Sequence, residues 1–463
     1  MSLRVALLAV VLVALLPAGG SAQLPGGGDA CTGELDASAV PQKPGPRVRY
    51  GVVPGVEAGQ SGAAPAQAKP EDRAKTIRAL ELLRPRTGVL TVRLNRLFWS
   101  DGDAGIARFE RLVKRYARRG YQIEVQLRYH PSAEQEGDIE AWTRYVREVV
   151  DRLGRYRAVR SLQVTNEVTV TFSADSSDGA YAGARDALIQ GVIAAHDEKQ
   201  ARGYGQLGIG FNWFYRLDPS TDSSFWGYLR DHGGAPFVRS LDWIGLDAYP
   251  GTFFPPAEQP GQERDGMVNA FSSLRCFAAI PGIPATVPIH VNENGWPTTP
   301  ARSADRQATA AAAMLSAVND FRGTYNVTDY RWHNLRDADS SDPRQEQQYG
   351  LMRDDYTPKP AFDVVCRFYA AHSARSGGTA CDARGPTLRL RVRCRRARLR
   401  GADVGAVARV AFRSRGRRLR VDRRAPFTAR LRRRGRVTAR VTLRSGRELR
   451  RTRRARACQR SSR

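Results

Sequence analysis

The chain has 463 residues, of which 41% are hydrophobic, and it carries 74 Lys and Arg against 46 Asp and Glu. This composition excludes a chain that is disordered throughout, and the length allows one large barrel plus a small module. The net charge of +28 lies entirely in residues 384–463, which contain 31 Arg, no Lys and three acids. Because the preceding residues are neutral overall, the chain cannot be treated as a single basic domain.

The N-terminus has the pattern of a secretory signal peptide. Arg4 precedes an unbroken apolar run, Val5–Leu16, and small residues follow it up to Ala22. We predict that residues 1–22 are removed on secretion; a signal anchor is disfavoured, because a membrane-spanning helix needs about 20 apolar residues. No later segment is apolar enough to cross a membrane, so we expect a secreted protein that is extracellular or associated with the cell envelope. Residues 23–46 are rich in Gly, Pro and Ala and are predicted to be a linker.

An even number of cysteines accompanies this signal. They are Cys31, Cys276, Cys366, Cys381, Cys394 and Cys458. In an oxidising compartment an even set favours disulfides, and zinc is the weaker alternative because no two of them form a Cys-x-x-Cys pair. The pairing stays open, although a Cys394–Cys458 bond could close a module at the end of the chain.

Strand and helix patterns alternate regularly after the linker. Strands are predicted at Arg47–Val53, Val89–Leu94, Tyr121–Tyr129, Ser161–Thr165, Leu207–Phe211, Leu241–Leu246, Val287–Val291 and Val327–Trp332. Helices are predicted at Glu71–Leu83, Gly105–Arg119, Ile139–Leu153, Ala180–Ala201, Ser224–Asp231, Met267–Ala279, Ala304–Phe321 and Pro360–His372. Eight such units are the number that closes a (β/α)8 TIM barrel, which we predict over residues 47–376. A doubly wound open sheet is the rival fold. It is disfavoured because the Gly-x-Gly-x-x-Gly motif typical of such sheets is absent after the first strand.

The arginine-rich end of the chain alternates apolar residues with Arg, which is the period of a half-buried strand. Strands are predicted at Leu388–Cys394, Val410–Phe412, Leu419–Val421, Phe427–Leu431 and Val437–Leu443. We therefore predict a small all-β sandwich over residues 377–463. Its Val-x-Phe and Ala-Pro-Phe patterns resemble the immunoglobulin-like modules appended to secreted actinobacterial enzymes.

Two glutamates fall at the C-terminal ends of predicted barrel strands. Strand four ends in Thr165-Asn166-Glu167, and strand seven ends in Asn292-Glu293-Asn294. Functional residues of a (β/α)8 barrel lie at that end, so the two carboxylates would face one another across its opening. Retaining glycoside hydrolysis needs such a pair, one as nucleophile and one as acid and then base. We predict that Glu167 and Glu293 are catalytic, without a metal or cofactor; the alternative is that each is a solvated loop charge.

The pattern resembles the secreted retaining (β/α)8 glycoside hydrolases of clan A, in which Asn-Glu on strand four supplies the acid/base and a Glu on strand seven the nucleophile. Over residues 47–372 it is most similar to glycoside hydrolase family 5. That family has an Arg, a His, an aromatic residue and a Trp on strands two, three, six and eight, and the corresponding positions hold Arg93, His130, Tyr249 and Trp332. We expect His130 to contact substrate or support the site, the alternative being a histidine satisfied by a neighbour.

The resemblance implies a role for each supporting residue. Arg93 would hold Glu293 ionised, and Tyr249 would donate a hydrogen bond to it. Asn166 would contact the sugar 2-hydroxyl. Trp332 would form the floor of the subsite that holds the cleaved sugar.

Two features depart from family 5. Gly295-Trp296-Pro297, after the predicted nucleophile, is similar to the β-1,3-glucanases of family 17, and it makes Trp296 a candidate for substrate binding. Family 5 often has a His two residues before the strand-six aromatic, where this chain has Asp247. We assign Asp247 no catalytic role, because a structural carboxylate bonded to loop amides explains it.

The resemblance implies a hydrolase that acts on a β-linked glycan of glucan or mannan type. The alternative is a non-catalytic protein that binds glycans or polyanions on a hydrolase scaffold. We expect a monomer. A cationic module would attract anionic cell-wall polymers, whereas nucleic acid is an unlikely partner because Phe412 and Phe427 are the only aromatic residues of the tail. Codon bias and solubility are the competing explanation for the Arg excess.

Overall fold

The structure is a computed structural model, and it describes most of the chain after residue 30. The described residues are 31–32, 35–55, 68–85, 88–215, 218–253, 262–373, 388–393, 396–401, 404, 407–415, 417–431, 435–443 and 448–454. The predicted signal peptide, residues 1–22, and the predicted Cys394–Cys458 disulfide lie outside them.

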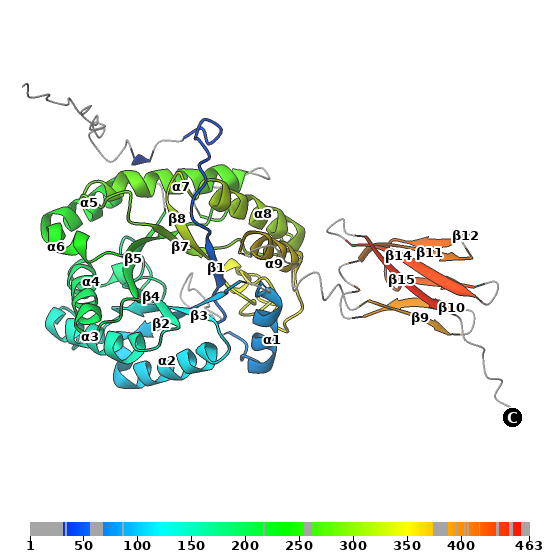
Figure 1. Cartoon of the computed structure of the whole chain (residues 1–463), viewed down its shortest axis with the longest axis horizontal. Helices are drawn as coiled ribbons and strands as arrows, with labels where there is room; N and C mark the ends of the chain where they lie inside the picture. The colour runs from blue at the N-terminus through cyan, green and yellow to red at the C-terminus, as the bar shows by residue number, and fades with distance from the viewer. Residues whose placement is uncertain are drawn as a thin grey trace, which may run out of the picture.

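Eight parallel strands form a closed barrel in which each strand pairs with the next in the chain and β8 pairs with β1 (Figure 1). The strands are β1 (Arg49–Val52), β2 (Thr91–Phe98), β3 (Gln122–Arg128), β4 (Val159–Val164), β5 (Gly208–Phe214), β6 (Trp243–Asp247), β7 (Ile289–Asn294) and β8 (Val327–Trp332). The closure confirms the predicted (β/α)8 barrel, and the open, doubly wound sheet is wrong.

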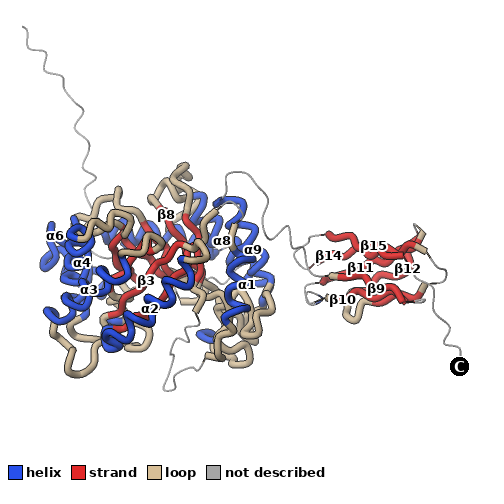
Figure 2. The backbone as a smooth tube through the Cα atoms, turned by 60° about the horizontal axis from the view of Figure 1, so that its bottom comes forward, coloured by secondary structure: helices blue, strands red, loops and turns tan. Residues whose placement is uncertain are grey.

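Helices surround this barrel (Figure 2). The α-helices of the described residues are α1 (Arg73–Leu83), α2 (Gly102–Ala117), α3 (Ile139–Gly154), α4 (Ala184–Ala201), α5 (Pro219–Tyr228), α6 (Gly234–Arg239), α7 (Gln262–Ala278), α8 (Ala304–Asp320) and α9 (Pro360–Ser373). Asp72, Asp138, Asp218 and Ser303 each accept a hydrogen bond from the first turn of the helix that follows, which explains where four helices begin. Within the described part, no helix combines the length and apolarity that a membrane span requires.

Strand β2 is longer than predicted. The apolar pattern ends at Leu94, but the strand continues to Phe98 after a register shift against β3 between Leu94 and Leu97. Arg96 within this bulge has a φ of 67°. Bulges re-aim side chains near active sites, and this one carries polar residues to the barrel mouth.

A buried ionic network fills part of the barrel interior. Glu124 accepts hydrogen bonds from Arg93 at 2.6 Å and from Arg331 at 3.0 Å. Arg331 also bonds Asp329 at 2.7 Å, and His290 Nε2 lies 3.1 Å from the same aspartate. Because buried charges are costly unless they are paired, this network fixes the position of Arg93 from below.

The described part of the predicted linker, residues 23–46, is attached to the barrel. Cys31 forms a disulfide with Cys276 at the end of α7, and the Gly323 N–H donates to the Lys43 carbonyl at 3.2 Å. Residues 35–46 therefore run along the barrel rather than through solvent. Composition does not reveal this attachment, because the linker makes it through backbone groups and one cysteine.

The C-terminal residues form two antiparallel sheets, with strand orders β13-β10-β9 and β12-β11-β14-β15. Their bounds are β9 (Arg389–Arg393), β10 (Arg396–Arg400), β11 (Val407–Ser414), β12 (Arg417–Asp422), β13 (Thr428–Arg430), β14 (Arg436–Leu443) and β15 (Glu448–Arg454). Alternate residues bury a separate core that includes Leu390, Leu399, Phe412, Phe427 and Val441. This confirms a small all-β module, while its likeness to immunoglobulin domains stays a prediction.

Candidate active site

The segment after β4 presents Glu167 at the mouth of the barrel. Thr165 and Glu167 have φ angles of 63° and 45°, a region that residues with side chains adopt only when their surroundings hold them. The Asn212 side-chain oxygen accepts from the Glu167 N–H at 3.0 Å, and the Gln163 amide donates to the Thr165 carbonyl at 2.8 Å. These contacts hold a strained backbone in the one orientation that turns Glu167 inward.

Glu167, Glu293 and Asp247 form a cluster of buried carboxyls. One carboxylate oxygen from each lies within 4.8 Å of those of the other two. Glu293 is on β7 and Asp247 is the last residue of the neighbouring β6, and a register shift between Leu246 and Asp247 makes the two residues partners. The structure thus brings together the two predicted glutamates and one aspartate that the sequence analysis left without a role.

Donors surround the carboxylate of Glu293. The Tyr249 hydroxyl donates to Oε2 at 2.8 Å, and Arg93 and Asn95 each donate to Oε1 at 3.2 Å. His333 Nδ1 lies 3.6 Å from Oε2. Burial opposes the charge of Glu293, but His333, Arg93 and the Tyr249 hydrogen bond outweigh burial and lower the pKa of this carboxyl. Glu293 is therefore ionised at neutral pH.

Glu167 has the opposite environment. Its Oε2 accepts from the Ser177 hydroxyl at 2.8 Å, and its carboxyl hydrogen-bonds with that of Asp247. Burial, followed by the negative charge of Glu293, raises the pKa of Glu167 to about 8. Glu167 consequently holds a proton at neutral pH.

Asp247 belongs to the same titrating cluster. Burial, then the charges of Glu293 and Glu167, raises its pKa well above the ordinary range. The Asn212 amide donates to Asp247 and, at 2.8 Å, to the Asn166 carbonyl oxygen. Asn212 thus connects the carboxyl cluster to the segment after β4.

Asn166 is held by the protein on both sides of its amide. Its oxygen also accepts from Gln126 at 2.7 Å and from Gln163 at 3.0 Å, and its nitrogen donates to the Ser176 carbonyl at 2.8 Å. The structure therefore leaves at most one amide N–H for the sugar 2-hydroxyl that the resemblance implies.

The remaining predicted residues lie at different depths. Trp332 is fully buried, and its indole N–H donates to the Tyr349 carbonyl at 3.2 Å. His130 is stacked on Phe98, with ring centroids 4.2 Å apart, and burial lowers the pKa of its imidazole. Trp296 is 4% exposed, with the Arg302 guanidinium 3.9 Å above its ring, so that this face is closed to a sugar.

Five residues of the site were not predicted. They are Asn95, Ser177, Asn212, Asp247 and His333. Asn95 follows Arg93 by two positions, the spacing that puts side chains on one face of a strand, so it could have been found. Asp247 stood out only as a departure from the family 5 pattern, and no local pattern gave it or Asn212 a role, because both act through neighbouring strands.

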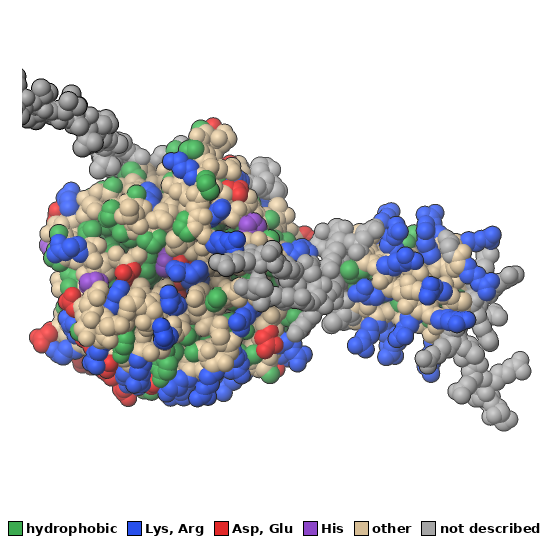
Figure 3. Space-filling view, viewed as in Figure 1, with side chains coloured by type: hydrophobic (Ala, Val, Ile, Leu, Met, Phe, Trp, Pro, Cys, Tyr) green, Lys and Arg blue, Asp and Glu red, His purple; other side chains and the backbone are tan. Residues whose placement is uncertain are grey.

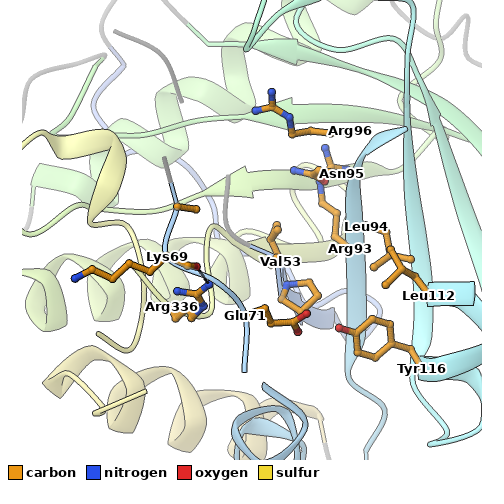
Figure 4. A pocket seen from close by; sticks show the side chains of 13 residues that line it. Val53, Lys69, Glu71, Arg93, Leu94, Asn95, Arg96, Leu112, Tyr116 and Arg336 are labelled. Carbon is orange, nitrogen blue, oxygen red and sulfur yellow. Dashed lines mark hydrogen bonds between the residues drawn. The ribbon is translucent and has the colours of Figure 1, made fainter. Parts of the chain in front are cut away.

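A cavity of about 340 Å³ lies beside the site. Arg93 and Asn95, which both bind Glu293, line one side of it, with Lys69 and Arg336 on the other (Figure 4). The cavity lies at the C-terminal ends of β1 and β2 and shares Arg93 and Asn95 with the site, whereas Glu167 and Glu293 do not line it.

A metal fits this cluster poorly. Three carboxylates suit a hard cation, but both oxygens of Glu293 already accept hydrogen bonds, and the Arg93 guanidinium lies 3.2 Å from one of them. A cation bound there would face a fixed positive charge. The arrangement suits proton transfer and nucleophilic attack.

Comparison with known proteins shows the fold. No family model and no curated protein matches the chain. The structure of GH5_18 from Streptomyces cattleya in complex with GlcNAc has a TM-score of 0.50 and 15% identity, over 72% of this chain and 82% of that one. Bacteroides uniformis beta-glucuronidase 2 has a TM-score of 0.47 and 13% identity; the match covers 89% of this chain but only 45% of that one. A family 39 glycoside hydrolase from Bacteroides cellulosilyticus WH2 has a TM-score of 0.46 and 13% identity, over 86% and 71%.

Proposed function

We propose that the barrel is a retaining glycoside hydrolase that cleaves β-linked glycans, with Glu293 as nucleophile and Glu167 as acid/base. One observation carries this proposal. Oxygens of the Glu167 and Glu293 carboxyls lie within 4.8 Å of each other, and the pKa of Glu167 is raised while that of Glu293 is lowered. Inverting enzymes hold their carboxyls about 6.5–9.5 Å apart to admit a water, and retaining enzymes about 5–5.5 Å apart.

Each residue has a defined part in two displacements. In the first, ionised Glu293 attacks the anomeric carbon, while Glu167 gives its proton to the glycosidic oxygen as that bond breaks. In the second, the Glu167 carboxylate takes a proton from water, the water oxygen bonds to the anomeric carbon, and Glu293 leaves. Two inversions give net retention. Arg93 and Tyr249 hold Glu293 in place for attack.

The substrate class is proposed more coarsely than the reaction. A β-linked glycan of glucan or mannan type follows from the family 5 resemblance, and the Streptomyces cattleya protein was crystallised with GlcNAc. A test panel should therefore include glucosides, mannosides and N-acetylglucosaminides. We also propose that the protein is secreted, which the N-terminal pattern and the Cys31–Cys276 disulfide support. The monomeric state stays a prediction.

Azide rescue tests the two roles separately. Glu167→Ala should lose roughly 10²–10⁴-fold in turnover of substrates that need protonation, because general acid–base catalysis contributes that much. Added azide should restore turnover of an activated aryl glycoside and yield a β-glycosyl azide, identified by NMR. Glu293→Ala with azide should yield the α-azide, since only one inversion remains.

An exposed glutamate provides the control. Glu134→Ala, in the loop after β3, should keep wild-type turnover. Undiminished hydrolysis by Glu167→Ala or Glu293→Ala would contradict the assignment. A wild-type protein that binds glycans of the panel but hydrolyses none would instead support the non-catalytic alternative.

A further inference from the structure

The outer face of the three-stranded sheet of the C-terminal module is built from arginine. Seven arginines at alternate positions of β9, β10 and β13 are exposed, Thr428 at the other outward position of β13 is partly buried, and Leu390, Ala397, Leu399 and Ala429 between them are buried. We call the outward set the arginine face; it consists of Arg389, Arg391, Arg393, Arg396, Arg398, Arg400 and Arg430.

The strand register places these charges directly opposite one another. Arg396 pairs with both Arg393 and Arg430, and Arg398 pairs with Arg391. Adjacent strands lie about 4.8 Å apart, and like charges at directly opposed positions are destabilising. The sheet therefore concentrates positive charge in a geometry that costs stability in the free protein.

No carboxylate compensates this face within the described residues. Asp422 is buried and accepts from Arg420 and from the Thr428 N–H, and Glu448 lies on β15 in the other sheet. On the side seen in Figure 3, the charged side chains of the described part of the module are basic, whereas the barrel mixes basic and acidic ones. The described residues therefore leave the arginine face with an excess of positive charge that attracts anions from solution.

The other sheet has a more mixed outer face. Arginines are opposed there as well, Arg413 with Arg418 and Arg440 with Arg450, but Arg413 also lies opposite Thr438, and Thr438 lies opposite Thr452. On the described strands β9, β10 and β13, the register opposes every outward arginine to another arginine except at Thr428, which lies opposite Arg398. Arginine is therefore denser on the arginine face than on the other sheet, and we place the binding surface there.

The side-chain chemistry narrows the ligand. Guanidinium groups bind carboxylates and phosphates through two parallel N–H donors, which lysine cannot do. Phe412 and Phe427 are both buried in the core, so the arginine face offers no aromatic ring on which a base or a sugar could stack. Recognition must act through the charged groups of the ligand.

We propose that the arginine face binds an acidic polysaccharide through the carboxylates of its uronic acid residues. The preference for a polysaccharide over nucleic acid rests on the proposed glycosidase function, because a module that holds glycan-rich material raises the concentration of substrate near the barrel. Binding through exposed charges weakens as salt screens them.

A pair of charge-matched variants of the full chain tests the proposal. The face variant carries Arg391→Gln, Arg396→Gln and Arg398→Gln; the control variant carries Arg413→Gln, Arg418→Gln and Arg450→Gln on the other sheet. Both lose three positive charges. At 50 mM NaCl we expect polygalacturonate to bind the wild type, the face variant to bind at least roughly tenfold more weakly, and the control variant to change less than about threefold.

Three outcomes would overturn the proposal. Equal weakening in both variants would show that net charge, not this face, governs binding. Tighter binding to duplex DNA or to inorganic polyphosphate than to polygalacturonate, at equal anion concentration, would assign the face to a phosphate polymer. If the wild type shows no salt-sensitive binding to polygalacturonate, the arginine face does not bind an acidic polysaccharide.

Two further measurements keep the test specific. A variant with Lys at the same three positions keeps the charge without the guanidinium fork, and we expect it to bind between the wild type and the face variant. Thermal melting of every variant checks folding. Binding is measured without turnover, so a failed hydrolase assay would not affect this result, and failed binding would not affect the hydrolase proposal.

Discussion

Two glutamates of the same chemical type carry opposite protonation because their neighbours differ. Glu293 receives hydrogen bonds from an arginine, an asparagine and a tyrosine, all of which favour its charged form. Glu167 receives one from a serine, but it is buried beside the charge of Glu293, so its charged form is disfavoured. Such a separation of pKa values assigns acid and nucleophile without reference to substrate.

The pH dependence of kcat/KM follows from these shifts. Glu293 must be ionised, so activity should fall only below its lowered pKa; Glu167 must be protonated, so activity should fall as pH rises through about 8. The hydrogen bond from Asp247 lowers the pKa of Glu167 and so opposes the raising effects of burial and of Glu293. Asp247→Ala removes this hydrogen bond, so the basic limb should move to higher pH. The loss of kcat/KM at pH 7 should be smaller than the roughly 10²–10⁴-fold effect of removing proton transfer itself.

A control separates this effect from a general change in charge. Asp197→Ala, on the exposed side of α4, should leave both limbs where they are. If the basic limb of Asp247→Ala stays in place or moves to lower pH, the hydrogen bond from Asp247 does not favour the charged form of Glu167.

At the scale of elements, one aspartate joins the ends of β3 and β4. Asp178 accepts from Arg128 at 2.7 Å and from the backbone N–H groups of Tyr129 and Asn166, both at 2.9 Å. Arg128 and Asp178 are both buried. The same loop carries Ser177, which donates to Glu167, so the loop's stability and the site's geometry depend on one buried ion pair.

Removing that aspartate should destabilise the protein strongly. Asp178→Ala leaves Arg128 buried without its partner, and breaking a buried pair costs about 3–5 kcal/mol. Asp175→Ala, three residues earlier, removes the partner of Arg96 in an ion pair whose two side chains, Arg96 and Asp175, are 27% and 28% exposed. Because partly exposed pairs contribute about 0.2–1 kcal/mol, this variant should lose much less stability. Urea unfolding followed by tryptophan fluorescence measures both free energies, and equal losses would contradict the importance of the buried pair.

The barrel could be predicted because buried parallel strands are short apolar runs separated by helical periods. The same alternation predicted that Glu167 and Glu293 lie close together, since the C-terminal ends of the strands share one edge of the barrel. The rest depends on distances between strands. Asp247 gains its role because a register shift between β6 and β7 makes it the partner of Glu293, and Arg96 lies in a bulge that the apolar pattern does not mark.

At the scale of the whole molecule, charge and core divide the chain in the same place. Residues 1–383 carry equal numbers of basic and acidic side chains, and residues 384–463 carry the entire excess. The barrel and the C-terminal module bury separate hydrophobic cores. The chemistry at Glu167 and Glu293 should therefore be independent of the arginine-rich module for a small neutral substrate.

Deletion of residues 384–463 tests that independence. The shortened protein should keep kcat/KM for a neutral aryl glycoside within about twofold, because a difference of that size corresponds to only about 0.4 kcal/mol of activation free energy. Its activity should also vary little between 50 and 500 mM NaCl, since a neutral substrate is neither attracted nor repelled over long distances by charges that salt would screen. Parallel salt titrations of the full chain and the shortened protein provide the comparison. A loss of tenfold or more, or a lower melting temperature of the shortened barrel, would mean that the module supports the catalytic domain directly.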